Sequence, residues 1–122
     1  MIVATTETIQ GRAIAETIGI CRGNVIRARH VGNDIVAGLR NIVGGEVNEY
    51  TKMMAEAREQ AYDRMVKHAE SLGADAIVGM RFTTSTVTQG AAEILAFGTA
   101  VKLAPAGAAA QAPDAQAFMT KA

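Results

Sequence analysis

A helical period of apolar positions dominates the middle of the chain. Apolar residues recur there every three or four positions: Met54, Ala57, Ala61, Met65, Ala69 and Leu72. Charged residues occupy the opposite face that this helical period would create: Lys52, Glu56, Glu59, Asp63, Lys67 and Glu70. This spacing predicts an amphipathic helix over Asn48–Leu72. The helix is expected to end at Gly73, because glycine readily takes the left-handed conformation of a C-cap.

Two segments with a period of two follow that helix. Ala76–Ser85 and Ala92–Lys102 alternate in side-chain direction and are rich in apolar residues, which predicts two strands. The link Val87–Gly90 is short and ends in glycine, so it is predicted to form a hairpin loop.

Two more extended segments precede the helix. Met1–Thr6 is short and β-branched, which favours a first strand. Ile14–Arg29 is predicted to be a long strand with isoleucines concentrated on one face. Gly19 and Gly23 within it indicate bends, bulges or a close approach by another backbone.

A shorter helix is predicted between the long strand and the long helix. Asn33 or Asp34 can cap its start. One apolar stripe follows: Ile35, Val36, Leu39, Ile42 and Val43. Gly44–Gly45 ends it.

These elements together predict an α+β domain. A small antiparallel sheet would be covered on one side by the long helix and the short one. The two strands after the helix are apolar on both faces, so a single helical layer leaves one apolar face in water. Exposed apolar faces of this kind usually mark interfaces, which predicts a homo-oligomer.

Length and composition divide the chain into two parts. With 122 residues, one domain with one core is expected. We expect the folded domain to span residues 1–103. Residues 104–122 are alanine-rich and carry both prolines, Pro105 and Pro113, which predicts a flexible tail. The alternative for its end, 116–121, is a short docking peptide.

Charge and targeting signals narrow the partners. The chain has 12 basic and 12 acidic residues, so no basic field favours nucleic acid. Its one cysteine, Cys21, excludes an intrachain disulfide. Met1–Gln10 lacks the pattern of a signal peptide, and no apolar run approaches about 20 residues. We therefore expect a cytoplasmic protein without a membrane partner.

Four ordered sequence blocks carry a family resemblance. They are AGLRNIVGGE (37–46), EYTKMMAEAREQAYDRM (49–65), LGADAIVGMRF (72–82) and QGAAEILAFGTAV (89–101). In this order they resemble the YbjQ family, an uncharacterised bacterial and archaeal group often labelled heavy-metal-binding. The resemblance implies a dodecin-like α+β subunit assembled as a ring, a homopentamer. It implies no established reaction and no established catalytic residues.

The metal label directs attention to the few soft ligands. Soft metals are held by several thiolates or imidazoles at fixed spacing. The chain offers Cys21, His30 and His68, with no pair three or four positions apart. A lone cysteine in a strand is most often a buried inert thiol, and helix methionines are usually core residues. A ring could still bring Cys21 or His30 from each copy to a shared axis, so a heavy-metal ion stays the candidate cofactor.

Charged residues supply the remaining candidates. Arg58 and Glu59 belong to the second of the four blocks that resemble the family, 49–65. They are candidates for an intersubunit salt bridge or a ligand contact. Arg81 and Glu93 are candidates for a small-molecule site at a subunit junction. No phosphate-binding glycine motif and no pairing of a nucleophile with a base is present.

Three function classes remain open at this point. The leading hypothesis is a non-enzymatic binding or scaffold module whose working unit is the ring. The second is a metal-binding protein with ligands from several subunits. The third is an enzyme with a small-molecule site between subunits, near Arg58, Arg81 or Glu93.

Overall fold

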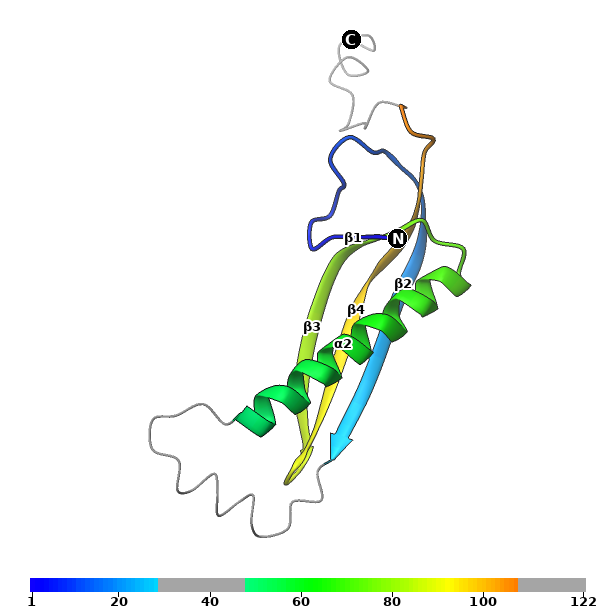
Figure 1. Cartoon of the computed structure of the whole chain (residues 1–122). Helices are drawn as coiled ribbons and strands as arrows, with labels where there is room; N and C mark the ends of the chain where they lie inside the picture. The colour runs from blue at the N-terminus through cyan, green and yellow to red at the C-terminus, as the bar shows by residue number, and fades with distance from the viewer. Residues whose placement is uncertain (29–47, 108–122) are drawn as a thin grey trace, which may run out of the picture.

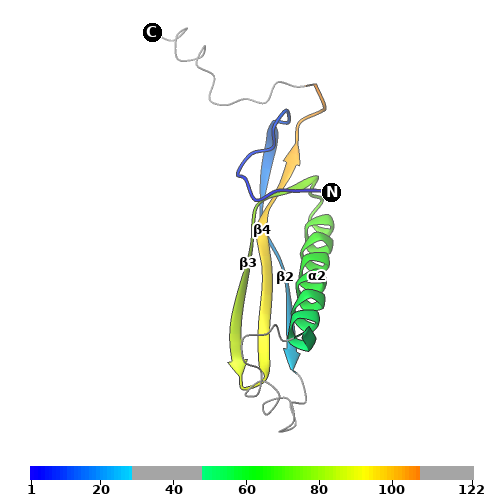
Figure 2. The same cartoon turned by 60° about the vertical axis from the view of Figure 1, so that its left-hand side comes forward.

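The computed structural model describes residues 1–28 and 48–107, and only the backbone for residues 48–50. One long helix lies across one face of a twisted sheet (Figure 1). In chain order the elements are β1 (Ile2–Val3), β2 (Ile14–Ala28), α2 (Asn48–Ser71), β3 (Ala76–Thr88) and β4 (Ala91–Leu103). Seen from the side, α2 and the sheet form two layers (Figure 2). The fold is therefore α+β, as predicted.

The sheet is mixed, which corrects the prediction of an antiparallel sheet. Its strand order is β1-β3-β4-β2, and β4 pairs antiparallel with both β2 and β3. The exception is β1, which pairs parallel with β3 through Ile2 with Ala76 and Val3 with Ile77. Alternation along a strand shows which side chains share a face. It says nothing of the direction of the neighbouring strand, so the sequence pattern could not reveal this pairing.

The helix α2 confirms the strongest prediction. It ends at Ser71, one residue before the predicted Leu72. Gly73 has a φ of 79° and donates its N–H to Glu70 O at 3.0 Å, while Ala74 N–H donates to Ala69 O at 3.0 Å. These bonds satisfy carbonyls that the helix end would otherwise leave open, so Gly73 closes the helix as a left-handed C-cap.

The core lies between α2 and the sheet. From the helix, four residues are almost fully buried: Ala57, Ala61, Met65 and Ala69. From the strands, the same cluster includes Cys21, Val25, Ile77, Met80, Ile94, Ala96 and Ala100. Because three of these four buried helix residues are alanines, the helix and the sheet lie close together. At Gly23 an added Cβ would lie 2.3 Å from both the Ala61 carbonyl oxygen and the Met65 backbone nitrogen.

The hairpin between β3 and β4 is longer than predicted. Val87 and Thr88 belong to β3, so the loop shrinks from four residues to Gln89 and Gly90. Gly90 has a φ of 77°, the left-handed conformation that this tight turn requires. Threonine and valine favour strands, which explains the extension.

The first strand is shorter than predicted, because β1 contains only Ile2–Val3 of the expected Met1–Thr6. The long strand β2 begins at Ile14 as predicted and is described to Ala28. The predicted short helix, His30 and the segment 108–122 lie outside the described residues.

Candidate functional site

The single helix covers only part of the sheet. An α-helix with its side chains is about 10–12 Å wide, and strands lie about 4.8 Å apart. One helix therefore covers about two strands, and α2 packs chiefly on β2 and β4. On β3, the residues beyond Met80 are exposed, so α2 leaves this part of the strand open.

An open groove lies between α2 and β3. It has a volume of about 450 Å³ and is lined by Ala55, Arg58, Glu59, Tyr62, Asp63 and Phe82. We call it the α2–β3 groove. Phe82 is 44% exposed there, although it is a large aromatic residue. Two of the predicted contact residues, Arg58 and Glu59, come together in this groove, and both are exposed.

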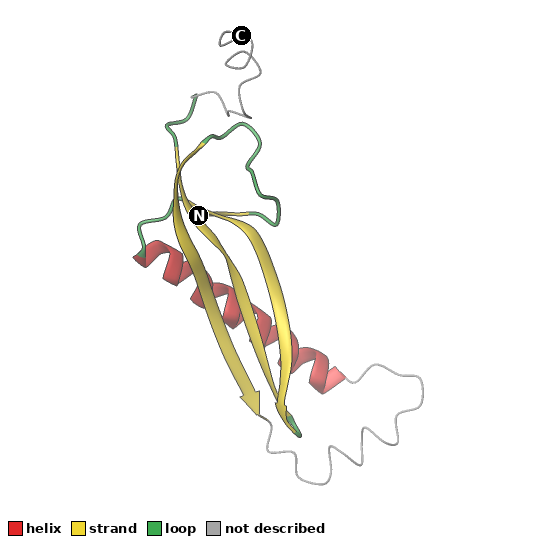
Figure 3. Cartoon of the chain, turned by 180° about the vertical axis from the view of Figure 1, so that it is seen from behind, coloured by secondary structure: helices red, strands yellow, loops and turns green. Residues whose placement is uncertain are grey.

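The opposite face of the sheet carries no helix in the described part of the chain (Figure 3). Cross-strand pairing places Ile20 beside Thr99, Arg22 beside Phe97, Asn24 beside Leu95 and Ile26 beside Glu93. We call these eight residues the outer sheet face. Ile20 is 73% exposed and Ile26 is 57% exposed, so the apolar side chains on this face meet water.

The other two predicted contact residues belong to this opposite side. Glu93 Oε2 accepts a hydrogen bond from Asn24 Nδ2 at 3.4 Å. Arg81 pairs with Phe97 across the β3–β4 ladder, and its Nη1 donates to Thr5 O and Met80 O, both at 2.8 Å. The sheet therefore separates Arg81 and Glu93 from the α2–β3 groove. The four candidates do not form one site within a protomer.

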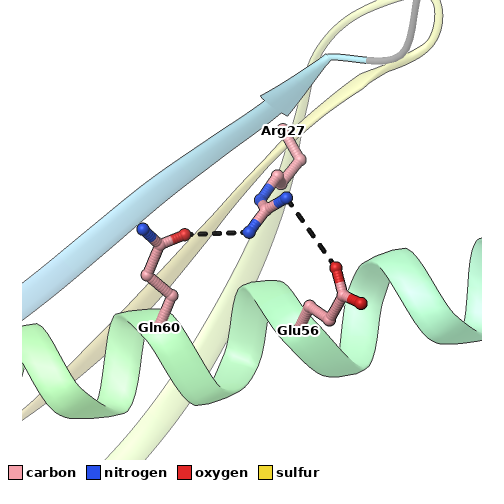
Figure 4. A network of polar contacts seen from close by, with 3 residues as sticks. All are labelled: Arg27, Glu56 and Gln60. Carbon is pink, nitrogen blue, oxygen red and sulfur yellow. Dashed lines mark hydrogen bonds and ion pairs between the residues drawn. The ribbon is translucent and has the colours of Figure 1, made fainter.

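Polar contacts tie β2 to the other flank of α2. Arg27 Nη2 donates to Gln60 Oε1 at 3.0 Å, and Arg27 Nη1 lies 3.9 Å from Glu56 Oε2 (Figure 4). Further along, Arg64 Nη1 donates to the Asn24 carbonyl at 2.7 Å. These contacts hold the helix over β2 and leave the β3 side open.

His68 completes this set at the edge of β2. Its Nδ1 accepts the backbone N–H of Arg22 at 3.0 Å. An imidazole nitrogen accepts a hydrogen bond through its lone pair. In this arrangement the Nδ1 lone pair is used within the fold.

Cys21 is the predicted metal ligand that the structure describes. It is fully buried beneath α2, and its Sγ lies 3.6 Å from the carbonyl oxygen of Gly98. Burial raises the pKa of the Cys21 thiol above its ordinary value, although its hydrogen bonds with the backbone oppose this effect. A metal ligand must be a thiolate, so this environment does not fit a ligand shared between subunits. His30 lies outside the described residues.

Residues 1–28 and 48–107 contain no group of three or more His, Cys, Asp or Glu side chains placed to hold a metal ion. No helix within those ranges is both long and apolar enough to cross a membrane.

Tyr62 and Phe82 were not among the residues singled out from the sequence. The helical period places Tyr62 one position after the buried Ala61, which leaves it at the edge of the apolar stripe. The chain has five aromatic residues in total, so an aromatic side chain at the boundary of the apolar stripe is the sequence feature that could have identified Tyr62 as a candidate.

Fold and site define a small α+β protein with a mixed four-stranded sheet, one covering helix in the described chain and two exposed surfaces. The chain belongs to the YbjQ family, whose model is described as "Putative heavy-metal-binding" and matches residues 1–104. This result confirms the resemblance seen in the four sequence blocks.

Curated relatives match over almost their whole length. A UPF0145 protein of Methanosarcina acetivorans is 60% identical over 103 residues, covering 84% of this chain and 97% of the relative. A UPF0145 protein of Vibrio campbellii is 61% identical over 103 residues, covering 84% and 99%. These names state no activity, so the family is an uncharacterised one.

One solved structure supports the fold. It is the crystal structure of a protein of unknown function from the DUF74 family of Pediococcus pentosaceus. The TM-score is 0.54 with 18% sequence identity, and the match covers 85% of this chain and 98% of that one. At this identity the similarity concerns the fold.

Proposed function

We propose that the protein is a homo-oligomeric, non-enzymatic binding or scaffold module whose working unit is a ring of identical subunits. The observation that carries this proposal is the exposed apolar part of the outer sheet face, where Ile20 and Ile26 are 73% and 57% exposed. Leu95 and Phe97 lie beside them and are half-buried. The proposed number of five subunits comes from the family resemblance.

The energy available from this surface fits an assembly contact. Fully burying a large apolar side chain contributes about 1.5–3 kcal/mol. More than half of each of Ile20 and Ile26 is exposed and could be buried at a contact. Burying the exposed parts of both residues would contribute about 2–4 kcal/mol per subunit. Both isoleucines lie on the same face of β2, so one contact could bury them together.

Native mass spectrometry of the full chain tests the assembly. We expect one defined oligomer that persists on dilution through the micromolar range. Ile20→Lys should shift it toward monomer, because a charge would be buried at the contact. Leu72→Lys is the matched control, since Leu72 is also exposed (39%) but lies at the end of α2. A monomeric full chain, or an Ile20→Lys variant that assembles normally, would refute the proposal.

The second candidate is heavy-metal binding with ligands from several subunits. The specific observation in its favour is the description of the matching family model. Because Cys21 is buried within its own subunit, His30 becomes the more informative residue to change. Elemental analysis of untagged protein should find stoichiometric metal that is lost in His30→Ala. Full metal content in both His30→Ala and Cys21→Ser would exclude these two residues as ligands.

We also propose the cytoplasm as the compartment of the protein. Its single cysteine, Cys21, is present as a free and buried thiol. Free thiols of this kind suit a reducing compartment.

A further inference from the structure

Strand β3 has one edge that is only partly covered. The other edge pairs with β4 from Ala76 to Thr88. On the open side, the N-terminal segment accepts two backbone bonds, from Gly79 N–H to Thr6 O (2.8 Å) and from Met80 N–H to Ala4 O (3.0 Å). Beyond Met80, no described residue bonds to the backbone of this edge of β3.

The sheet register shows which backbone groups point outward. Arg22 directs its N–H away from β4, toward His68, so its partner Phe97 directs its backbone groups toward β3. Arg81 is the β3 partner of Phe97 and therefore faces β4. Because this direction alternates along a strand, Phe82, Thr84 and Thr86 present their N–H and C=O groups at the open edge.

The two edges of the sheet differ in the side chains that bond to their backbone groups. At the β2 edge, α2 supplies Arg64 to the Asn24 carbonyl and His68 to the Arg22 N–H. At the β3 edge, residues 82–88 read Phe-Thr-Thr-Ser-Thr-Val-Thr. They include no proline, no lysine and no other charge, which are among the devices that keep an exposed edge from pairing. The register with β4 shifts between Thr86 and Thr88, at the hairpin end of the segment.

We infer that the open edge of β3, at Phe82, Thr84 and Thr86, accepts an extended segment of a second copy of this chain. This contact would continue the sheet across the subunit boundary by strand addition. The inference deepens the proposed function and rests on it, since it names an accepting surface within the ring.

Three observations favour a second copy as the occupant. The chain carries 12 basic and 12 acidic residues, so copies do not repel one another through net charge. The edge is continuous with the outer sheet face, because Arg81 and Thr83 share rows with Phe97 and Leu95. On its other side the edge borders the α2–β3 groove, where Phe82 is exposed and would be covered by an added strand.

Thr84→Pro tests the inference with Thr84→Val as the matched control. Proline removes the outward N–H of Thr84, and it takes no bond from the β3–β4 ladder because that N–H does not face β4. Edge positions of this kind tolerate proline. Valine keeps the N–H and removes only the hydroxyl group. Far-UV circular dichroism and thermal melting check that both variants fold.

Native mass spectrometry across a dilution series gives the readout. We expect the natural chain and Thr84→Val to assemble alike. Thr84→Pro should need a protein concentration higher by about tenfold or more, the effect of one lost hydrogen bond together with a displaced strand. Equal assembly of the proline and valine variants would overturn the inference and leave the proposed function intact. A monomeric natural chain would instead refute the proposed function.

Hydrogen exchange of the natural chain gives an independent test if Thr84→Pro does not fold. In the assembled protein, the amides of Phe82, Thr84 and Thr86 should exchange slowly and become faster on dilution. Fast exchange at all three amides in the assembled state would overturn the inference.

Discussion

The close approach of α2 to β2 at Gly23 leads to a quantitative prediction for Gly23→Ala. An added Cβ would lie 2.3 Å from the Ala61 carbonyl oxygen and from the Met65 backbone nitrogen, and 2.6 Å from the Arg64 Cβ. Ordinary contacts of a Cβ begin at 3.4 Å. The helix would have to move by about 1 Å, the difference between these distances. The nearest obstacles are backbone atoms, so a change of side-chain rotamer cannot relieve the clash.

The cost follows from the packing lost by that movement. A radial gap of about 0.5–1 Å forfeits a quarter to a half of the dispersion energy of each contact. Overpacking typically costs about 1–3 kcal/mol, and the movement of a whole helix places Gly23→Ala at the upper end, about 3 kcal/mol. With a urea dependence of about 1–3 kcal/mol per molar, the unfolding midpoint should fall by about 1–3 M.

Urea unfolding followed by circular dichroism measures this loss. The protein concentration must be held constant, because assembly adds a mass-action term to the stability. Gly98→Ala is the matched control: its nearest obstacle is the Cγ2 methyl of Ile77 at 2.6 Å, and its nearest backbone atoms, Val78 O at 3.1 Å and Met80 Cα at 3.3 Å, lie farther away than those at Gly23. We expect Gly98→Ala to cost less. The reasoning fails if Gly23→Ala lowers the free energy of unfolding by less than about 0.5 kcal/mol, or by less than Gly98→Ala.

Three further predictions concern single side chains. Met65→Ala should cost about 2–5 kcal/mol in urea unfolding, because Met65 is fully buried and its loss leaves a cavity. A cost below 1 kcal/mol would contradict the packing described here. Glu56→Gln should change stability by less than about 1 kcal/mol, since the Arg27–Glu56 contact is long and exposed; a larger loss would show a stronger pair. Burial raises the pKa of Cys21 above its ordinary value of 9.0, so the native state keeps a proton that the unfolded chain releases. Stability should therefore fall as pH rises above about 9, and Cys21→Ser should lessen that fall; an unchanged slope in the variant would assign it to other groups.

Much of the local structure could be predicted from side-chain periods. The spacing from Met54 to Leu72 identified α2 to within one residue of its end. Alternation identified the two strands after it, but β3 runs on to Thr88 beyond the predicted Ser85, and β4 is one residue longer at each end than the predicted Ala92–Lys102. Such periods are visible because each element must bury one side against the core, and that requirement acts on neighbouring positions of the sequence.

The candidate site was only partly predictable. Arg58 and Glu59 lie together in the α2–β3 groove as neighbours on one helix, whereas Arg81 and Glu93 lie across the sheet from them. Phe82 joined the groove without having been singled out. Whether Phe82 lines the groove depends on the lateral position of α2 over the sheet. The hydrogen bonds between α2 and β2 set that position, and they leave no periodic pattern in the sequence.

The sequence by itself determined the long helix and its buried side, the three long strands, the α+β class and the membership of the YbjQ family. It also indicated an apolar face without an intrachain cover. Only the tertiary structure decided that β1 pairs parallel with β3, that α2 lies over β2 and β4, and that the β3 edge stays open beyond Met80. The physical reason is range: periods arise from contacts that each residue makes with one core. Strand order and helix position depend on pairings between segments far apart in the chain, and the same alternation fits several of them.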